Sequence, residues 1–197
     1  MTKTATSSAT PAPAPAPPDV PTRDRILFAT AELFRRQGYH GTGLKQIVAE
    51  ADAPFGSLYH HYPGGKQELG EQVIESAGAF FQALVTAVYD AESSTEDSVR
   101  AVFTGAAQTL EATDYEDACP IATVALEVAS TDDRLRRATA AVFERWTLAL
   151  TERLGDRGKA LAVIAALEGA FVLCRASRST EAMHAAGEMA AAQVADA

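Results

Sequence analysis

The sequence is poor in cysteine and carries no excess of basic charge. Its 197 residues include two cysteines, Cys119 and Cys174, which are far apart and form no CxxC pair. This usage predicts neither a disulfide framework nor a zinc site, and it fits a reducing, cytoplasmic setting. The formal net charge is −9. A broad basic surface, which supplies most non-specific affinity for phosphates, is therefore not expected.

Long hydrophobic runs are also lacking. The most apolar segment, residues 160–174, is shorter than the roughly 20 residues of a membrane span and contains Glu168. Residues 1–20 contain a run over residues 11–17 in which Pro alternates with Ala, and no apolar region follows Lys3. This composition predicts a disordered tail and no secretory signal. We therefore expect no membrane association.

Motifs for catalysis are missing as well. The sequence contains no HExxH, no paired ExxH, no phosphate-binding loop and no GxSxG. Glu127 and Glu168 are isolated carboxylates. An enzyme built on a helical bundle stays an alternative, but no catalytic motif supports it. No cofactor or metal site is predicted.

The acidity is unevenly distributed along the chain. Residues 20–70 carry six basic and five acidic side chains, whereas residues 71–197 carry ten basic and twenty acidic ones. A nearly neutral N-terminal segment thus precedes an acidic remainder of the chain. Such a segment can bind DNA only through a few well-placed contacts.

Helical periodicity runs through the chain after the tail, and no segment is typical of a strand. Three helices are expected first: from Thr22, as the N-cap, to Gly38; from Thr42 to about Ala51; and from Pro54 to Tyr62. Two short helices joined by a tight turn outline a helix-turn-helix, although an ordinary helical hairpin gives the same periodicity. Six more helices are expected over residues 66–91, 95–113, 119–130, 131–154, 157–177 and from 180 to near the end.

These patterns predict an all-α protein of about nine helices in three parts. Residues 1–20 form the tail, residues 21–66 the helix-turn-helix domain, and residues 67–197 a larger helical domain for ligand binding and dimerisation. The helix expected over residues 157–177 is apolar on nearly all sides, so it must be covered on nearly all sides. Either a second copy of the chain covers one side, or the helix is central within a monomer.

The segment between Arg25 and Leu69 resembles the DNA-binding domain of the TetR family of bacterial regulators. AELFRRQGY ends the first helix, IVAEA lies in the second, GSLYHHY forms the third, and PGGKQEL enters the fourth. The PGGK form, with CPIATVALEVA and ALEGAFVLCRA further on, resembles the LmrA/YxaF-like branch. The resemblance implies a homodimeric repressor that binds a palindromic double-stranded DNA operator and is released by a small molecule.

Residues expected at DNA follow from this resemblance. Thr42 is expected to cap the second helix and to bond a phosphate, Tyr59 to reach the sugar-phosphate backbone, and Lys66 to clamp a phosphate. Phe55 could contact a thymine methyl or pack against the turn. Asp52 stands where the family usually has a glycine that ends the second helix. The predicted DNA-binding set is Thr42, Lys45, Phe55, Gly56, Ser57, Tyr59, His60 and Lys66.

Aromatic and apolar positions on the middle helices are candidates for the effector site, and the same positions could form a plain core stripe. The set is Phe81, Phe103, Cys119, Phe143, Trp146 and Leu150. The branch implies a planar, aromatic, drug-like or flavonoid-like effector. The residues expected at the dimer interface are Leu161, Ile164, Leu167, Phe171, Met183 and Met189. A helical protein-binding adaptor without DNA affinity is the second alternative.

Overall fold

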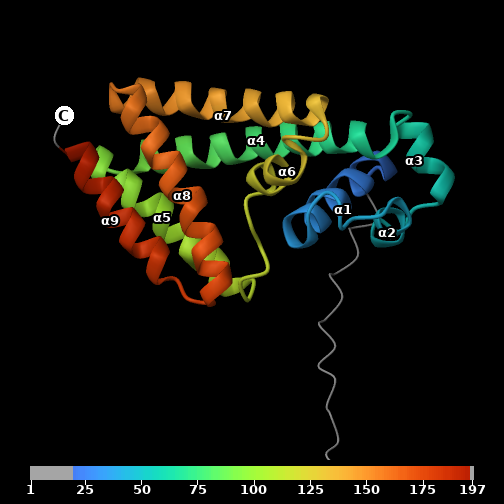
Figure 1. The fold of residues 1–197 in the computed structure, drawn as a ribbon, viewed down its shortest axis with the longest axis horizontal. Coiled ribbons are helices and arrows are strands. Elements are labelled where there is room, and N and C mark those ends of the chain that lie inside the picture. Colours follow the sequence, from blue (N-terminus) through green and yellow to red (C-terminus); the bar gives the residue numbers. More distant parts are fainter. Residues whose placement is uncertain (1–19, 196–197) are drawn as a thin grey trace, which may run out of the picture.

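The computed structural model describes residues 20–195, so the predicted tail lies, except for its last residue, outside the described residues. Within this range the chain forms nine helices and no strand, as predicted (Figure 1). Their bounds are α1 Thr22–Gln37, α2 Leu44–Glu50, α3 Phe55–His61, α4 Gly65–Ala91, α5 Thr95–Ala112, α6 Pro120–Val128, α7 Asp133–Leu154, α8 Arg157–Ser177 and α9 Glu181–Ala195.

The first three helices form a small domain with its own core. Ile26, Ile47, Leu58 and Tyr62 are fully buried in one cluster, together with Leu69 from the start of α4. The Tyr62 hydroxyl donates a hydrogen bond of 2.7 Å to the carbonyl oxygen of Arg23, which ties the end of α3 to the start of α1. Burial of Leu58 and Tyr62 on one side of α3 leaves its opposite side facing outward.

The longest helix, α4, joins this domain to the rest of the molecule (Figure 1). Leu69 belongs to the core of the first domain, and Val73 and Ile74 belong to a second cluster shared with α1, α6 and α7. Phe81 and Tyr89, further along, pack against a third cluster formed by α5, α8 and α9. One continuous helix therefore takes part in every core of the molecule.

Two glycines allow close helix contacts in the C-terminal domain. A Cβ atom at Gly78 of α4 would lie 2.6 Å from a methyl group of Val142 on α7, and one at Gly187 of α9 would lie 2.8 Å from Phe103 of α5. Trp146 of α7 reinforces the first contact, because its indole N–H donates to the carbonyl oxygen of Gly78 at 3.0 Å. The pairs α4 and α7, and α5 and α9, are thus held close together.

Helix α8 would pass for a membrane span by length and composition alone. The helix has 21 residues, and the apolar run over residues 160–174 is only a part of it. In the fold it packs against both α7 and α9. Ala160, Val163, Ala170 and Cys174 lie in the core on one side, and the other side is exposed.

Several predicted helix starts were wrong by one or two residues, among them those of the first three helices and of α7, which begins at Asp133 and not at residue 131. Thr22 is the first helical residue of α1, and Pro21 is its N-cap. Gly43 caps α2 without a side-chain hydrogen bond, and Pro54 is the N-cap of α3. Thr42 does not cap α2, because its hydroxyl donates to the carbonyl oxygen of Gly38 at 2.7 Å and so closes the turn behind α1.

Candidate DNA-binding and ligand-binding sites

Helix α3 presents an aromatic surface at the outer end of the first domain. Phe55 and Tyr59, one turn apart, are 45% and 48% exposed, and their rings meet edge to face with centroids 5.9 Å apart. Gly56 lies between them with no atom near its missing side chain, and His60 is exposed beside Tyr59. We call Phe55, Gly56, Ser57, Tyr59 and His60 the recognition face. Two large rings without a cover in the described chain indicate a surface for binding.

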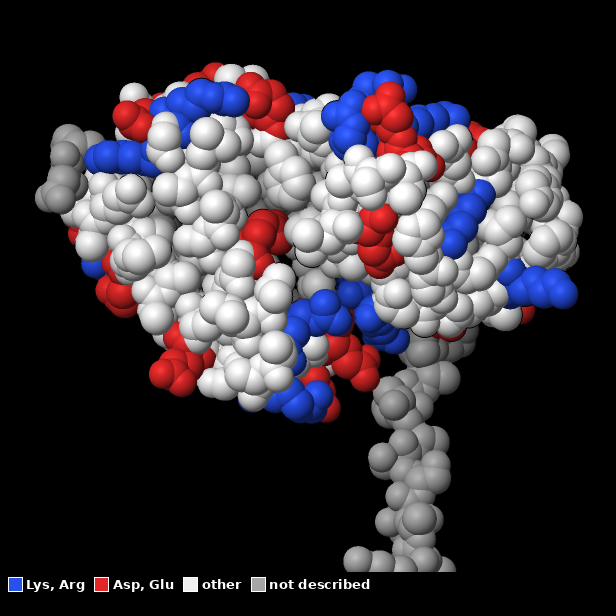
Figure 2. Space-filling model, viewed as in Figure 1, with Lys and Arg blue, Asp and Glu red and all other residues white. Residues whose placement is uncertain are grey.

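Basic residues around the recognition face are few. Lys45 is exposed on α2, and Lys66 is half-buried at the first turn of α4. The Lys66 ammonium lies 4.4 Å from the centre of the Tyr39 ring, and burial lowers its pKa while Glu127 opposes that change. Figure 2 shows this end of the molecule as mostly uncharged surface with separate blue atoms.

The predicted role of Thr42 is constrained by its surroundings. Its side chain is only 1% exposed, and its hydroxyl already donates to Gly38 and accepts from the Gln37 amide at 3.2 Å. Thr42 therefore shapes the turn between α1 and α2. Its contact with a phosphate stays a prediction, as does DNA contact by the other residues of that set.

Asp52 adopts the left-handed backbone conformation, with φ of +46°. Its carbonyl oxygen accepts a hydrogen bond of 3.0 Å from Arg25 of α1. The conformation turns the chain sharply between α2 and α3. Aspartate thus occupies a position at which only glycine is free of steric cost.

Helix α6 of the C-terminal domain contacts the first domain through Glu127. The Glu127 carboxylate accepts a hydrogen bond of 2.6 Å from the backbone N–H of His40. It also packs against Gly38, where an added Cβ would lie 1.7 Å from a carboxylate oxygen. Gly38 has φ of +78°, so backbone conformation and contact both require glycine there. The turn that ends at Thr42 is therefore held by α6.

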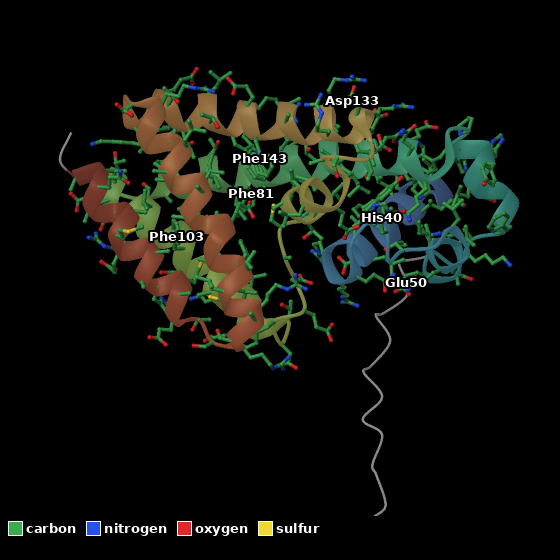
Figure 3. All side chains as sticks on the ribbon, viewed as in Figure 1. His40, Glu50, Phe81, Phe103, Asp133 and Phe143 are labelled. Carbon is green, nitrogen blue, oxygen red and sulfur yellow. The ribbon has the colours of Figure 1, made fainter. Side chains whose placement is uncertain are left out.

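A cavity of about 270 Å³ lies in the C-terminal domain. Phe81 of α4, Phe103 of α5, and Trp146 and Leu150 of α7 line it, as do several valines and residues of α8. The rings of Phe81 and Trp146 are tilted against each other with centroids 4.8 Å apart. Figure 3 shows Phe81 and Phe103 within the C-terminal domain, away from His40. Four of the six residues predicted at the effector site thus share one cavity.

Phe143 and Cys119 are not among the residues that line this cavity. Phe143 packs edge to face against Trp146 with ring centroids 5.6 Å apart. Cys119 lies in a second hollow of about 210 Å³ between α6 and α8, next to Glu168, which borders both hollows. Burial raises the pKa of the Cys119 thiol well above its usual value. Cys119 is therefore a neutral neighbour of Glu168.

Two polar groups of the main cavity were not among the residues predicted at the effector site. The Tyr89 hydroxyl is buried and has no hydrogen-bond partner within residues 20–195. Glu168 of α8 is half-buried, and burial raises its pKa to about 7. A carboxylate inside an otherwise apolar helix was the signal for Glu168. Tyr89 had no comparable signal.

The exposed side of α8 is apolar from Leu161 to Leu173. Leu161, Val172 and Leu173 are 48%, 57% and 61% exposed, and Ala165 and Gly169 lie between them on the same side. Met189 of α9 is 63% exposed. We call these six residues the α8/α9 face. An exposed apolar stripe of this kind is typical of an interaction surface.

Four of the residues predicted at the dimer interface lie, in the single chain, in the core or at the two hollows. Leu167 and Met183 are buried in the core, Ile164 and Leu167 line the main cavity, and Phe171 borders the second hollow. Only Leu161 and Met189 belong to the α8/α9 face.

Comparisons with known proteins agree with the fold and extend it. Residues 26–73 match the model for the bacterial regulatory proteins of the TetR family, and residues 95–189 match the LmrA/YxaF-like C-terminal domain of transcriptional regulators. The HTH-type transcriptional regulator YxaF of Bacillus subtilis is 33% identical over 137 residues, which are 70% of this chain and 72% of that protein. The HTH-type transcriptional regulator Rv0196 of Mycobacterium tuberculosis is 35% identical over 169 residues, covering 79% and 85% of the two chains.

A solved structure supports the same fold. The regulatory protein TetR from Rhodobacter sphaeroides superposes with a TM-score of 0.77 and 19% identity, over 87% of this chain and 97% of the other. At this identity the match concerns architecture alone. The matched models and relatives together span both domains. The chain therefore belongs to the TetR family of DNA-binding transcriptional regulators and has a C-terminal domain of the LmrA/YxaF-like type.

Proposed function

We propose that the protein is a repressor that binds a palindromic operator as a homodimer and leaves it when a small aromatic molecule enters the main cavity. The observation that carries this proposal is the position of α4. It begins at Gly65, where the ring of Tyr59 from the recognition face lies 3.5 Å from the position of an added Cβ. It ends beyond Phe81 and Tyr89 in the cavity wall. Events in the cavity can thus move the recognition face.

Dimer geometry is the variable that a ligand would change. Two recognition faces must enter successive major grooves about 34–36 Å apart. A ligand that shifts α4 alters this separation and favours a form unsuited to DNA. A coupling of about 1–3 kcal/mol is enough for a usable switch. We expect such a regulator in the cytoplasm, with no catalytic activity of its own.

DNA binding is tested by fluorescence anisotropy with duplexes from the region upstream of the protein's own gene. We expect the logarithm of the affinity to fall linearly with the logarithm of the salt concentration, because phosphate contacts release counterions. Lys66→Ala should weaken binding to all sequences and reduce the salt slope by about one. Lys159→Ala, which changes a lysine of α8, is the matched control and should leave the slope unchanged.

The same titration separates the alternatives. Absence of binding at low salt would contradict the repressor and favour a protein-binding adaptor. Binding that no aromatic compound weakens would contradict ligand release and leave a DNA-binding protein without this switch.

A further inference from the structure

The residues that line the main cavity restrict the chemical class of its ligand further than aromatic character alone does. The cavity of about 270 Å³ lies near the lower end of the roughly 300–1,000 Å³ typical of ligand sites. Its walls are mostly apolar, with the rings of Phe81, Phe103, Trp146 and Tyr89 around it. Such walls favour a ligand with a compact aromatic body.

Two carboxyl groups line this cavity, and Glu168 is the less exposed of them, whereas Glu152 is exposed at the rim. Within residues 20–195, no ion pair joins Glu168 to an arginine or lysine. The arginines that line the two hollows, Arg153 and Arg175, have other partners. Arg153 pairs with Asp90 at 2.8 Å, and Arg175 donates to the carbonyl oxygens of Tyr115 and Glu116. A buried carboxylate without a counter-ion is costly, so a cation supplied from outside would be bound favourably.

We propose that the effector is a protonated amine with an aromatic body, whose ammonium group binds the Glu168 carboxylate while its rings lie among Phe81, Phe103 and Trp146. This inference rests on the proposed function of the same cavity as the effector site. Aromatic faces near the ammonium add a cation–π attraction, which strengthens in a desolvated site. An anionic ligand is disfavoured, because it would meet Glu168 with like charge. The unpartnered Tyr89 hydroxyl offers a second polar contact.

A matched pair of probes tests this proposal on the full chain. Biphenylmethylamine and biphenylmethanol have nearly the same shape, and only the amine is cationic near neutral pH. Binding is measured by calorimetry and by the fluorescence of Trp146, the single tryptophan of the chain, which lines the cavity. We expect the amine to bind at least tenfold more tightly than the alcohol. Glu168→Gln should reduce that ratio to near one, because it removes the charge that binds the ammonium group.

The control is Glu152→Gln, because Glu152 is an exposed carboxylate at the rim of the same cavity. This variant should keep the tenfold preference for the amine. The inference is overturned if the alcohol binds native protein as tightly as the amine, if Glu168→Gln keeps the preference, or if neither probe binds.

DNA release is measured separately, so that failure of this inference is distinguishable from failure of the proposed function. Binding of the amine as expected, without release of DNA, supports the ligand class and contradicts the switch. Release of DNA by the alcohol as readily as by the amine supports the switch and contradicts the ligand class.

Discussion

At the scale of single residues, Glu168 makes stability depend on pH. Its carboxyl has a pKa of about 7 in the fold because of burial, against an ordinary value of 4.5. The folded pKa is the higher one, so this contribution to stability is complete below the unfolded pKa and is lost as the pH rises through the folded pKa. Glu168→Gln is neutral throughout. We expect its free energy of unfolding, relative to the native protein, to rise by about 2 kcal/mol between about pH 5 and pH 8.

Urea unfolding at both pH values measures this difference. The titratable and charged groups that face Glu168 come from four helices: Tyr89 of α4, Cys119 and Glu127 of α6, Glu152 and Arg153 of α7, and Arg175 of α8. Glu152→Gln, at the exposed rim, should show no such pH dependence. If the free energies of unfolding of Glu168→Gln and the native protein differ by the same amount at both pH values, the prediction is contradicted.

Asp52 carries a second prediction at this scale. Its φ of +46° places a Cβ in a conformation that costs L-residues about 1–2 kcal/mol, and aspartate tolerates it better than alanine does. Asp52→Ala should therefore lower the free energy of unfolding by about 1 kcal/mol. Asp52→Gly should not lower it, because glycine has no Cβ. Equal losses for both variants, measured by urea unfolding, would show that the side chain matters for another reason.

At the scale of helices, α6 carries the prediction for coupling. Glu127 near its end holds the backbone of His40, while Cys119 at its start borders Glu168. Glu127→Ala removes this hydrogen bond to the first domain, and Glu127 does not line the main cavity. We expect ligand affinity to stay unchanged, and the effect of ligand on DNA affinity to fall by fivefold or more, a loss of about 1 kcal/mol of coupling.

DNA anisotropy with and without ligand measures this coupling. Glu116→Ala is the matched control, since Glu116 reaches Arg36 of the first domain only at 3.9 Å on an exposed surface. If Glu127→Ala keeps the full ligand effect, then α6 does not transmit the signal.

Helix positions could be predicted from the sequence because their ends carry local signals. Asp132 caps α7 by accepting from the N–H groups of Arg134 and Leu135, and Gly155 ends that helix in the left-handed conformation. The side of α8 that faces its own chain carried no local signal. Leu161 and Leu167 are chemically identical, and only packing against α7 and α9 makes one exposed and the other buried.

The two candidate sites differ in the same way, because one follows from local sequence and the other depends on packing. The recognition face follows a motif of consecutive residues, so sequence resemblance located its members. The cavity combines α4, α5, α7 and α8, and its lining depends on how these helices are tilted. Periodicity identified Phe81, Phe103, Trp146 and Leu150 as inward-facing, but not Tyr89. The prediction that Thr42 caps α2 was wrong because the preference for threonine at N-caps competes with the tight turn that engages its hydroxyl.

At the scale of the whole molecule, the α8/α9 face predicts the assembly. It is apolar from Leu161 to Leu173 of α8, although the chain as a whole is acidic with a net charge of −9. Small residues, Ala165 and Gly169, lie between its leucines and would let a second helix approach closely. A symmetric contact of this kind uses the same surface on both copies. The chain should therefore sediment as a dimer at micromolar concentration.

Leu173→Arg tests this assembly, because it places one charge from each copy within the α8/α9 face. We expect the variant to sediment as a folded monomer and to bind a palindromic operator more than tenfold more weakly, since each monomer contacts one half-site. Leu84→Arg is the matched control: Leu84 is 50% exposed on α4, outside the α8/α9 face, and should leave the dimer intact. A dimeric Leu173→Arg would place the interface elsewhere, and a monomeric native chain that binds its operator with full affinity would remove the need for paired recognition faces.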